Sequence, residues 1–203
     1  MQATSTIYSL FGLVLGLGIA EILRGFAQAW RIVRGVGAVK SEIRIGWLVP
    51  LLGTLVIMDQ TQFYISAYMM RDAIPFTYFS LLSVLAVVGA YYLCSTFIFP
   101  DDPADWPDFD VYYLRVKRIV VGGVIAVNLA LGLFTAVLAF SGRHFDTPGQ
   151  SSLFDALLSL AFLPLIIALF FARSVRTNFV LLLLLNLTLI LGAIAPIVEH
   201  PAV

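Results

Sequence analysis

The chain has 203 residues, of which 61% are hydrophobic and 12% are charged, and its mean hydropathy is +0.98. Such a composition is typical of a polytopic membrane protein and excludes an ordinary soluble globular domain. The formal net charge is +0, and no polar stretch is long enough for a separate catalytic or nucleic-acid-binding domain. We therefore expect an all-α fold, one domain that comprises residues 1–203, and no nucleic-acid partner.

Long apolar segments recur along the sequence with short polar breaks between them. A hydrocarbon core about 30 Å thick requires roughly 20 apolar residues for each helix that crosses it. On this criterion the sequence predicts a bundle of six transmembrane helices, at approximately residues 4–27, 45–69, 74–99, 119–140, 153–171 and 179–198.

A ridge of small residues occupies one face of the first predicted span: Ser9, Gly12, Gly16 and Ala20. Small residues at a spacing of three or four let two helix backbones approach closely, so we expect the ridge to be a helix-packing surface. The expected partners are the lipid bilayer and, through this ridge, a second copy of the chain or a larger membrane complex.

A polar stripe continues from the ridge toward the end of the first span. Glu21 and Arg24 are three residues apart, a spacing that brings side chains together on a helix, so we expect an ion pair. Arg24 lies near the predicted membrane interface and can extend its charge toward water. Two interpretations of Glu21 remain open, a structural ion pair and the inner group of an ion pathway.

The second predicted span contains the sequence MDQTQFYIS, in which Asp59, Gln62 and Ser66 are expected to share one face. An ionised acid in hydrocarbon costs at least ~2.5 kcal/mol, so Asp59 must face the interior, pair with a base or stay protonated. Along its own helix, Arg71 is about 18 Å away. We expect Asp59 to be the central group of a pathway in which Gln60, Gln62 and Ser66 hydrate the outer mouth. Structural hydrogen bonding between helices is the alternative.

Two asparagines, Asn128 and Asn186, are expected near the midplane of the fourth and sixth spans, because each follows a basic cluster by a similar distance. Amide side chains at this depth commonly join helices by hydrogen bonds. We expect these two amides to bond each other, with substrate binding as the alternative.

Lysine and arginine are concentrated in alternate connectors. The connectors after the first, third and fifth spans carry Arg24, Arg31, Arg34, Lys40, Arg44, Arg115, Lys117, Arg118, Arg173 and Arg176. The opposite side carries only Arg71 and Arg143. By the positive-inside rule, this distribution predicts that the odd-numbered connectors are cytoplasmic and that both termini lie outside.

The residues that metal, cofactor or enzyme chemistry requires are not arranged in the expected patterns. His144 and His200 fall in outer loops or ends, so no intramembrane pair is available for haem iron. The acidic connector at 99–118 lacks the alternating ligands, turn glycine and closing glutamate of a calcium loop. Metalloprotease, nucleophile-elbow and phosphate-loop patterns are missing as well. We expect no metal, no cofactor and no enzymatic activity.

Two segments carry a resemblance to known proteins: GLVLGLGIAEILRGFAQAWR at 12–31 and WPDFDVYYLRVKR at 106–118. In these segments the chain resembles a broad set of small, uncharacterised six-span bacterial inner-membrane proteins. The resemblance implies a bacterial inner membrane, in which the predicted topology places both termini on the periplasmic side. That set has no assigned activity, so the resemblance implies no site residues.

Two functions fit these observations best, and a lipid-binding or sensing role is a third. The first is a channel or transporter for a proton or small cation that uses the intramembrane carboxylates Asp59 and Glu21. The alternative is a non-transporting accessory, assembly or sensory subunit that docks to a partner complex through the small-residue ridge of the first span.

Overall fold

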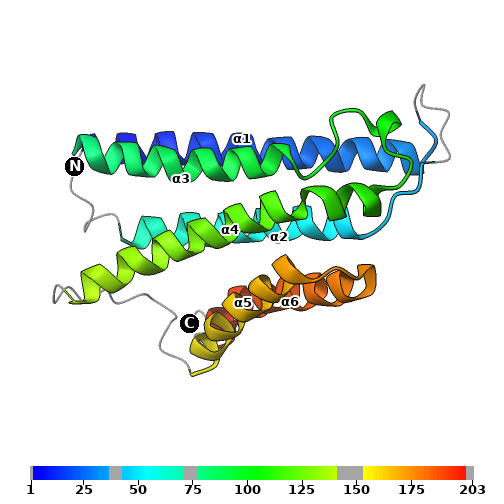
Figure 1. Ribbon diagram of the computed structural model, residues 1–203. Helices are drawn as coiled ribbons and strands as arrows, with labels where there is room; N and C mark the ends of the chain where they lie inside the picture. The colour runs from blue at the N-terminus through cyan, green and yellow to red at the C-terminus, as the bar shows by residue number, and fades with distance from the viewer. Residues whose placement is uncertain (1, 37–42, 71–76, 141–152, 200–203) are drawn as a thin grey trace.

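The computed structural model of the protein describes residues 2–36, 43–70, 77–140 and 153–199. These residues form six α-helices and one short 3-10 helix (Figure 1). The helices are α1 (Gln2–Val33), α2 (Leu48–Met69), α3 (Tyr78–Thr96), η2 (Pro103–Asp105), α4 (Phe109–Phe140), α5 (Leu153–Phe171) and α6 (Val175–Glu199). Outside the described residues lie Lys40, Arg71, Arg143, His144 and His200.

Five of these helices are long and apolar enough to cross a membrane. Their spanning segments are Phe11–Val33, Leu48–Met69, Tyr78–Thr96, Phe109–Val137 and Val175–Ile194. Helix α5 contributes a shorter apolar segment, Leu157–Phe171, within the residues described. The protein is thus a multi-pass helical membrane bundle, whereas the sixth span and the sidedness of the termini stay predictions.

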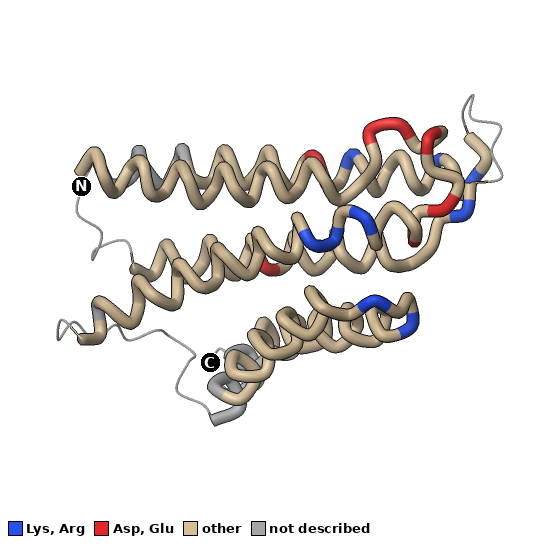
Figure 2. Tube along the Cα trace, viewed as in Figure 1, with Lys and Arg blue, Asp and Glu red and all other residues tan. Residues whose placement is uncertain are grey.

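The helices are arranged in three layers of two, with α1 beside α3, α2 beside α4, and α5 beside α6 (Figure 1). Helices α1, α3 and α5 run in one direction and α2, α4 and α6 run in the other, so α2 and α4 form the central layer. Charged residues gather at the end of the bundle where α1 ends and α4 begins (Figure 2). Asp59 differs from them because it lies near the middle of α2.

Close packing of α1 uses mainly a different face from the predicted ridge, in which Gly12 is half-buried against Tyr64. The buried positions of α1 recur at helical spacing: Phe11, Leu15, Gly18, Ile22, Gly25 and Ala29. A Cβ at Gly25 would overlap the ring of Phe99, so only glycine allows this approach. Gly16 and Ala20 are exposed, and no described atom lies within 4 Å of a Cβ built at Gly16. Within the chain, Gly18 and Gly25 therefore take the role expected of the ridge, since Gly18 lies against Ser95 and Gln60 and Gly25 lies against Phe99.

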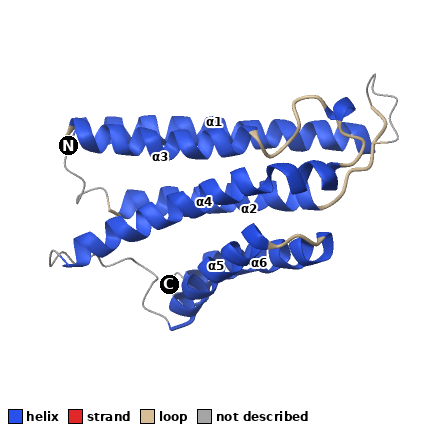
Figure 3. Ribbon diagram, in the orientation of Figure 1, coloured by secondary structure: helices blue, strands red, loops and turns tan. Residues whose placement is uncertain are grey.

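The fourth helix begins at Phe109, whereas the sequence predicted its span from residue 119. The helix begins earlier because an apolar face continues through this segment, in which Phe109, Tyr113 and Val120 are all buried. The connector before α4 is held by the one before α2, since Arg44 N donates to Pro107 O at 2.8 Å and Phe109 N donates to Arg44 O at 3.1 Å. Figure 3 shows both connectors as loops at the same end of the bundle. The basic residues at 115–118 therefore lie on a helix.

Candidate functional site

Asp59 lies at a meeting point of three helices and is only 4% exposed. From α3, Tyr91 Oη donates a hydrogen bond to Asp59 Oδ2 at 2.7 Å. From α4, Asn128 Nδ2 lies 3.1 Å from Asp59 Oδ1 and 3.3 Å from Oδ2, and donates to both. Neither ion pair among the described residues, Arg24 with Glu21 and Arg44 with Asp108, includes Asp59. The carboxyl group is thus satisfied by neutral donors from two other helices.

The orientation of the Asn128 amide is fixed by a second acceptor. Its Nδ2 also donates to the backbone carbonyl of Val124 at 3.0 Å. Rotating the amide by half a turn would bring its oxygen against two oxygen acceptors at once. The amide hydrogens therefore point at the Val124 carbonyl and at Asp59.

The polar cluster around Asp59 also includes Gln60 of α2 and Ser95 of α3. Gln60 is 0% exposed, and its Nε2 donates to Ser95 Oγ at 2.8 Å. Ser95 Oγ in turn donates to Tyr91 O at 2.9 Å. Gln60 Oε1 is buried without a hydrogen-bond partner among the described residues. This oxygen lies 3.6 Å from a Cβ built at Gly18. Helix α1 therefore covers the side of the cluster that α2, α3 and α4 leave open.

Apolar side chains close the cluster above and below along the bundle. On the side nearer the start of α1, the ring of Phe63 meets the ring of Tyr91 edge to face at 5.3 Å and stacks on Phe11 at 5.7 Å. On the other side, Val56 and Val124 belong to the larger apolar core. Apolar side chains therefore flank Asp59 toward both ends of the bundle.

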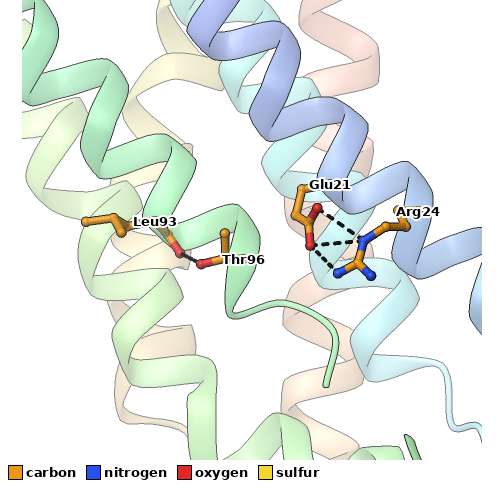
Figure 4. Close-up of polar contacts among 4 residues, drawn as sticks. All are labelled: Glu21, Arg24, Leu93 and Thr96. Carbon is orange, nitrogen blue, oxygen red and sulfur yellow. Dashed lines mark hydrogen bonds and ion pairs between the residues drawn. The ribbon is translucent and has the colours of Figure 1, made fainter. Parts of the chain in front are cut away.

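Glu21 and Arg24 form a separate polar contact on the surface of α1 (Figure 4). Arg24 Nη2 lies 2.5 Å from Glu21 Oε1, and Arg24 Nε donates to both carboxylate oxygens at 3.2 Å. The side chains are 61% and 28% exposed for Arg24 and Glu21, respectively. Opposite them on α3, Thr96 bonds the carbonyl of Leu93 within its own helix. Glu21 is thus paired on the surface, while Asp59 is satisfied by different residues in the interior.

The predicted pathway residues Gln62 and Ser66 do not accompany Asp59 into the interior. Gln62 is exposed and Ser66 is half-buried, while the buried face of α2 next to Asp59 is formed by Gln60 and Phe63. Helical spacing keeps Gln62 and Ser66 on the same side of α2 as Asp59, but they lie toward the exposed edge of that side. Their role at an outer mouth stays a prediction. The interior neighbours of Asp59 come from α3 and α4, and a pattern confined to α2 does not reveal them.

The two predicted interhelical amides have separate partners instead of bonding each other. Asn128 bonds Asp59, as described above, and Asn186 Nδ2 donates to Leu51 O at 3.2 Å and to Leu182 O at 2.8 Å. Asn186 therefore joins α6 to α2. Both amides lie at helix contacts, but they face different neighbours, because α2 packs against α4 on one side and α6 on another.

A second buried polar cluster surrounds Lys117, a residue that the sequence placed in a connector. Lys117 is 3% exposed, and its Nζ donates to Leu169 O at 3.0 Å, to Ala172 O, and to Asn178 Oδ1 at 2.8 Å. Tyr113 Oη donates to the same Asn178 oxygen at 2.9 Å. The ammonium group thus binds carbonyls at the end of α5, where the helix dipole favours positive charge. The four-residue spacing of Tyr113 and Lys117 could have indicated a shared helix face.

No protein-family model, curated protein or solved structure matches this chain. The resemblance to small six-span bacterial inner-membrane proteins therefore stays a prediction.

We expect Lys117→Met to lower the free energy of unfolding by about 1–3 kcal/mol, because it leaves carbonyl groups at the end of α5 without their donor. The neighbouring exposed residue gives a matched control, and Arg118→Met should change this free energy by no more than about 0.5 kcal/mol. The measurement is reversible unfolding in lipid–detergent micelles. Equal effects of the two substitutions would contradict the role given to Lys117.

Proposed function

We propose that this protein carries protons or small cations across the membrane, with Asp59 as the group that binds the ion. The observation that carries the proposal is an acid in the bundle interior with hydrogen-bond donors from α3 and α4 and no lysine or arginine partner among the described residues. We place the protein in a bacterial inner membrane with both termini periplasmic. The basic residues gathered at one end of the bundle support this orientation (Figure 2).

The cost of burying an acid favours a functional role for Asp59 over a purely structural one. An asparagine at this position would also accept a hydrogen bond from Tyr91 and would carry no charge to bury. An ionisable side chain within a membrane helix is expensive, and its default interpretation is a site on an ion pathway. An acid is needed at this position if the group must gain and lose a positive ion.

Carriage requires the apolar contacts on either side of Asp59 to open. Phe63 and Phe11 separate the carboxyl group from one end of the bundle, and Val56 and Val124 separate it from the other. Opening one side at a time would let Asp59 exchange its ion with each solution in turn while the membrane stays sealed. The arrangement with apolar side chains on both sides of Asp59 then corresponds to the state between the two openings.

We expect Asp59→Asn to abolish ion flux in proteoliposomes, because asparagine keeps the shape of the side chain and removes its charge. The matched control is Asp105→Asn, which removes an exposed carboxylate from the 3-10 helix and should leave flux unchanged. Size-exclusion chromatography and thermal unfolding check that both variants fold. Undiminished flux through folded Asp59→Asn would remove the proposal.

A second candidate function is that of a non-transporting accessory, assembly or sensory subunit. The favouring observation is that Gly16 and Ala20 of the small-residue ridge are exposed and that α1 packs within the chain through Gly18 and Gly25 instead. The exposed part of the ridge can then receive a helix from a second copy or from a partner complex.

We expect Gly16→Leu to split an oligomer or release a partner in native gels, because the larger side chain keeps the second helix away. Gly132→Leu is the matched control, since Gly132 is also exposed and has no described atom within 4 Å of a built Cβ. Equal migration of both variants and the unsubstituted protein would contradict docking through this ridge.

A further inference from the structure

We infer that the ion carried by Asp59 is the proton and that the site excludes sodium and potassium. The inference rests on the proposed function and narrows it to one ion. It follows from the groups around the carboxyl group, which donate hydrogen bonds to it and supply few oxygen ligands for a metal ion.

Both carboxyl oxygens of Asp59 accept hydrogen bonds from neutral donors. A carboxylate offers about four lone-pair sites. Tyr91 Oη occupies one on Oδ2, and Asn128 Nδ2 lies within hydrogen-bond distance of both Oδ1 and Oδ2. Because the other Asn128 amide hydrogen goes to Val124 O, a single hydrogen is shared between the two carboxyl oxygens. About two lone-pair sites therefore remain, and one of them suffices for an O–H bond.

The neighbours of Asp59 present hydrogens where a metal ion needs oxygens. Hard cations are bound by several oxygen ligands, usually carboxylates, carbonyls and water. The Asn128 amide turns its nitrogen toward Asp59, and the Val124 carbonyl prevents the opposite orientation. The free amide oxygen of the cluster, Gln60 Oε1, lies against Gly18 of α1, whereas Asp59 contacts α3 and α4. A metal ion at Asp59 would therefore face the amide hydrogens of Asn128 and would find one further oxygen, the Tyr91 hydroxyl, among these neighbours.

Proton carriage needs no reactant beyond water at each side. A proton from hydronium on one side forms an O–H bond at a carboxylate oxygen of Asp59, which becomes neutral. When the other side opens, that bond breaks, the proton passes to water, and the carboxylate is regenerated. Among the described residues, the titratable groups that face Asp59 are Tyr91 and Cys94, and both are neutral in their protonated forms. The charge that changes is that of Asp59 alone.

The test compares three ions in vesicles that contain the full chain. A trapped pH-sensitive dye reports proton entry under an imposed membrane potential, and trapped sodium- and potassium-sensitive dyes report those ions under matched gradients. We expect proton entry that Asp59→Asn reduces to the level of empty vesicles. Sodium and potassium entry should equal that of empty vesicles for both proteins.

The possible outcomes separate this inference from the proposed function. Sodium or potassium entry that depends on Asp59 overturns the inference and leaves ion carriage through Asp59 in place. Absence of any Asp59-dependent flux, with all three ions tested on folded protein, overturns both. Asp59→Glu keeps the carboxyl group, so its proton entry should exceed that of Asp59→Asn, and equal loss in both variants counts against proton binding at this position.

Discussion

Burial of the Asp59 carboxyl group is the constraint on which the centre of the bundle depends. In hydrocarbon an acid without hydrogen bonds is unstable, so the helices beside α2 must supply donors. Tyr91 supplies one from α3 and Asn128 supplies another from α4, which fixes how both helices are rotated about their axes. Gly18 then allows α1 to approach the remaining side, where Ser95 and Gln60 lie.

Hydrogen bonds from a buried lysine hold the end of the bundle where the charges gather. There the lysine at 117 is buried, and its donors are used by the last carbonyls of α5 and by Asn178 at the start of α6. This contact ties the outer α5–α6 layer to α4. The two polar clusters differ in charge. In the Lys117 cluster a cation binds carbonyl groups where α5 and α6 meet, whereas in the Asp59 cluster an acid has no countercharge among the residues described. For this reason we assign ion exchange to the Asp59 cluster.

The sequence predicted the features that depend on local pattern. Hydropathy indicated the helical membrane bundle, and a spacing of three residues is enough to bring Glu21 and Arg24 together on one helix. The contacts of Asp59 are different, because Tyr91 and Asn128 are 32 and 69 residues away in sequence. Gly18 and Gly25 could not be distinguished from Gly12 and Gly16 by spacing alone. Which glycines face a neighbour is decided by how α1 is rotated against α3, and that rotation is a property of the whole bundle.

The central claim is that Asp59 gains and loses a proton inside the folded bundle. Infrared difference spectroscopy of the full protein in lipid measures this directly, because a protonated carboxyl group has a carbonyl stretch distinct from that of a carboxylate. The account predicts a carbonyl band that weakens as the pH is raised, is lost in Asp59→Asn, and does not respond to sodium or potassium. A spectrum in which Asp59→Asn removes no pH-dependent band would contradict it.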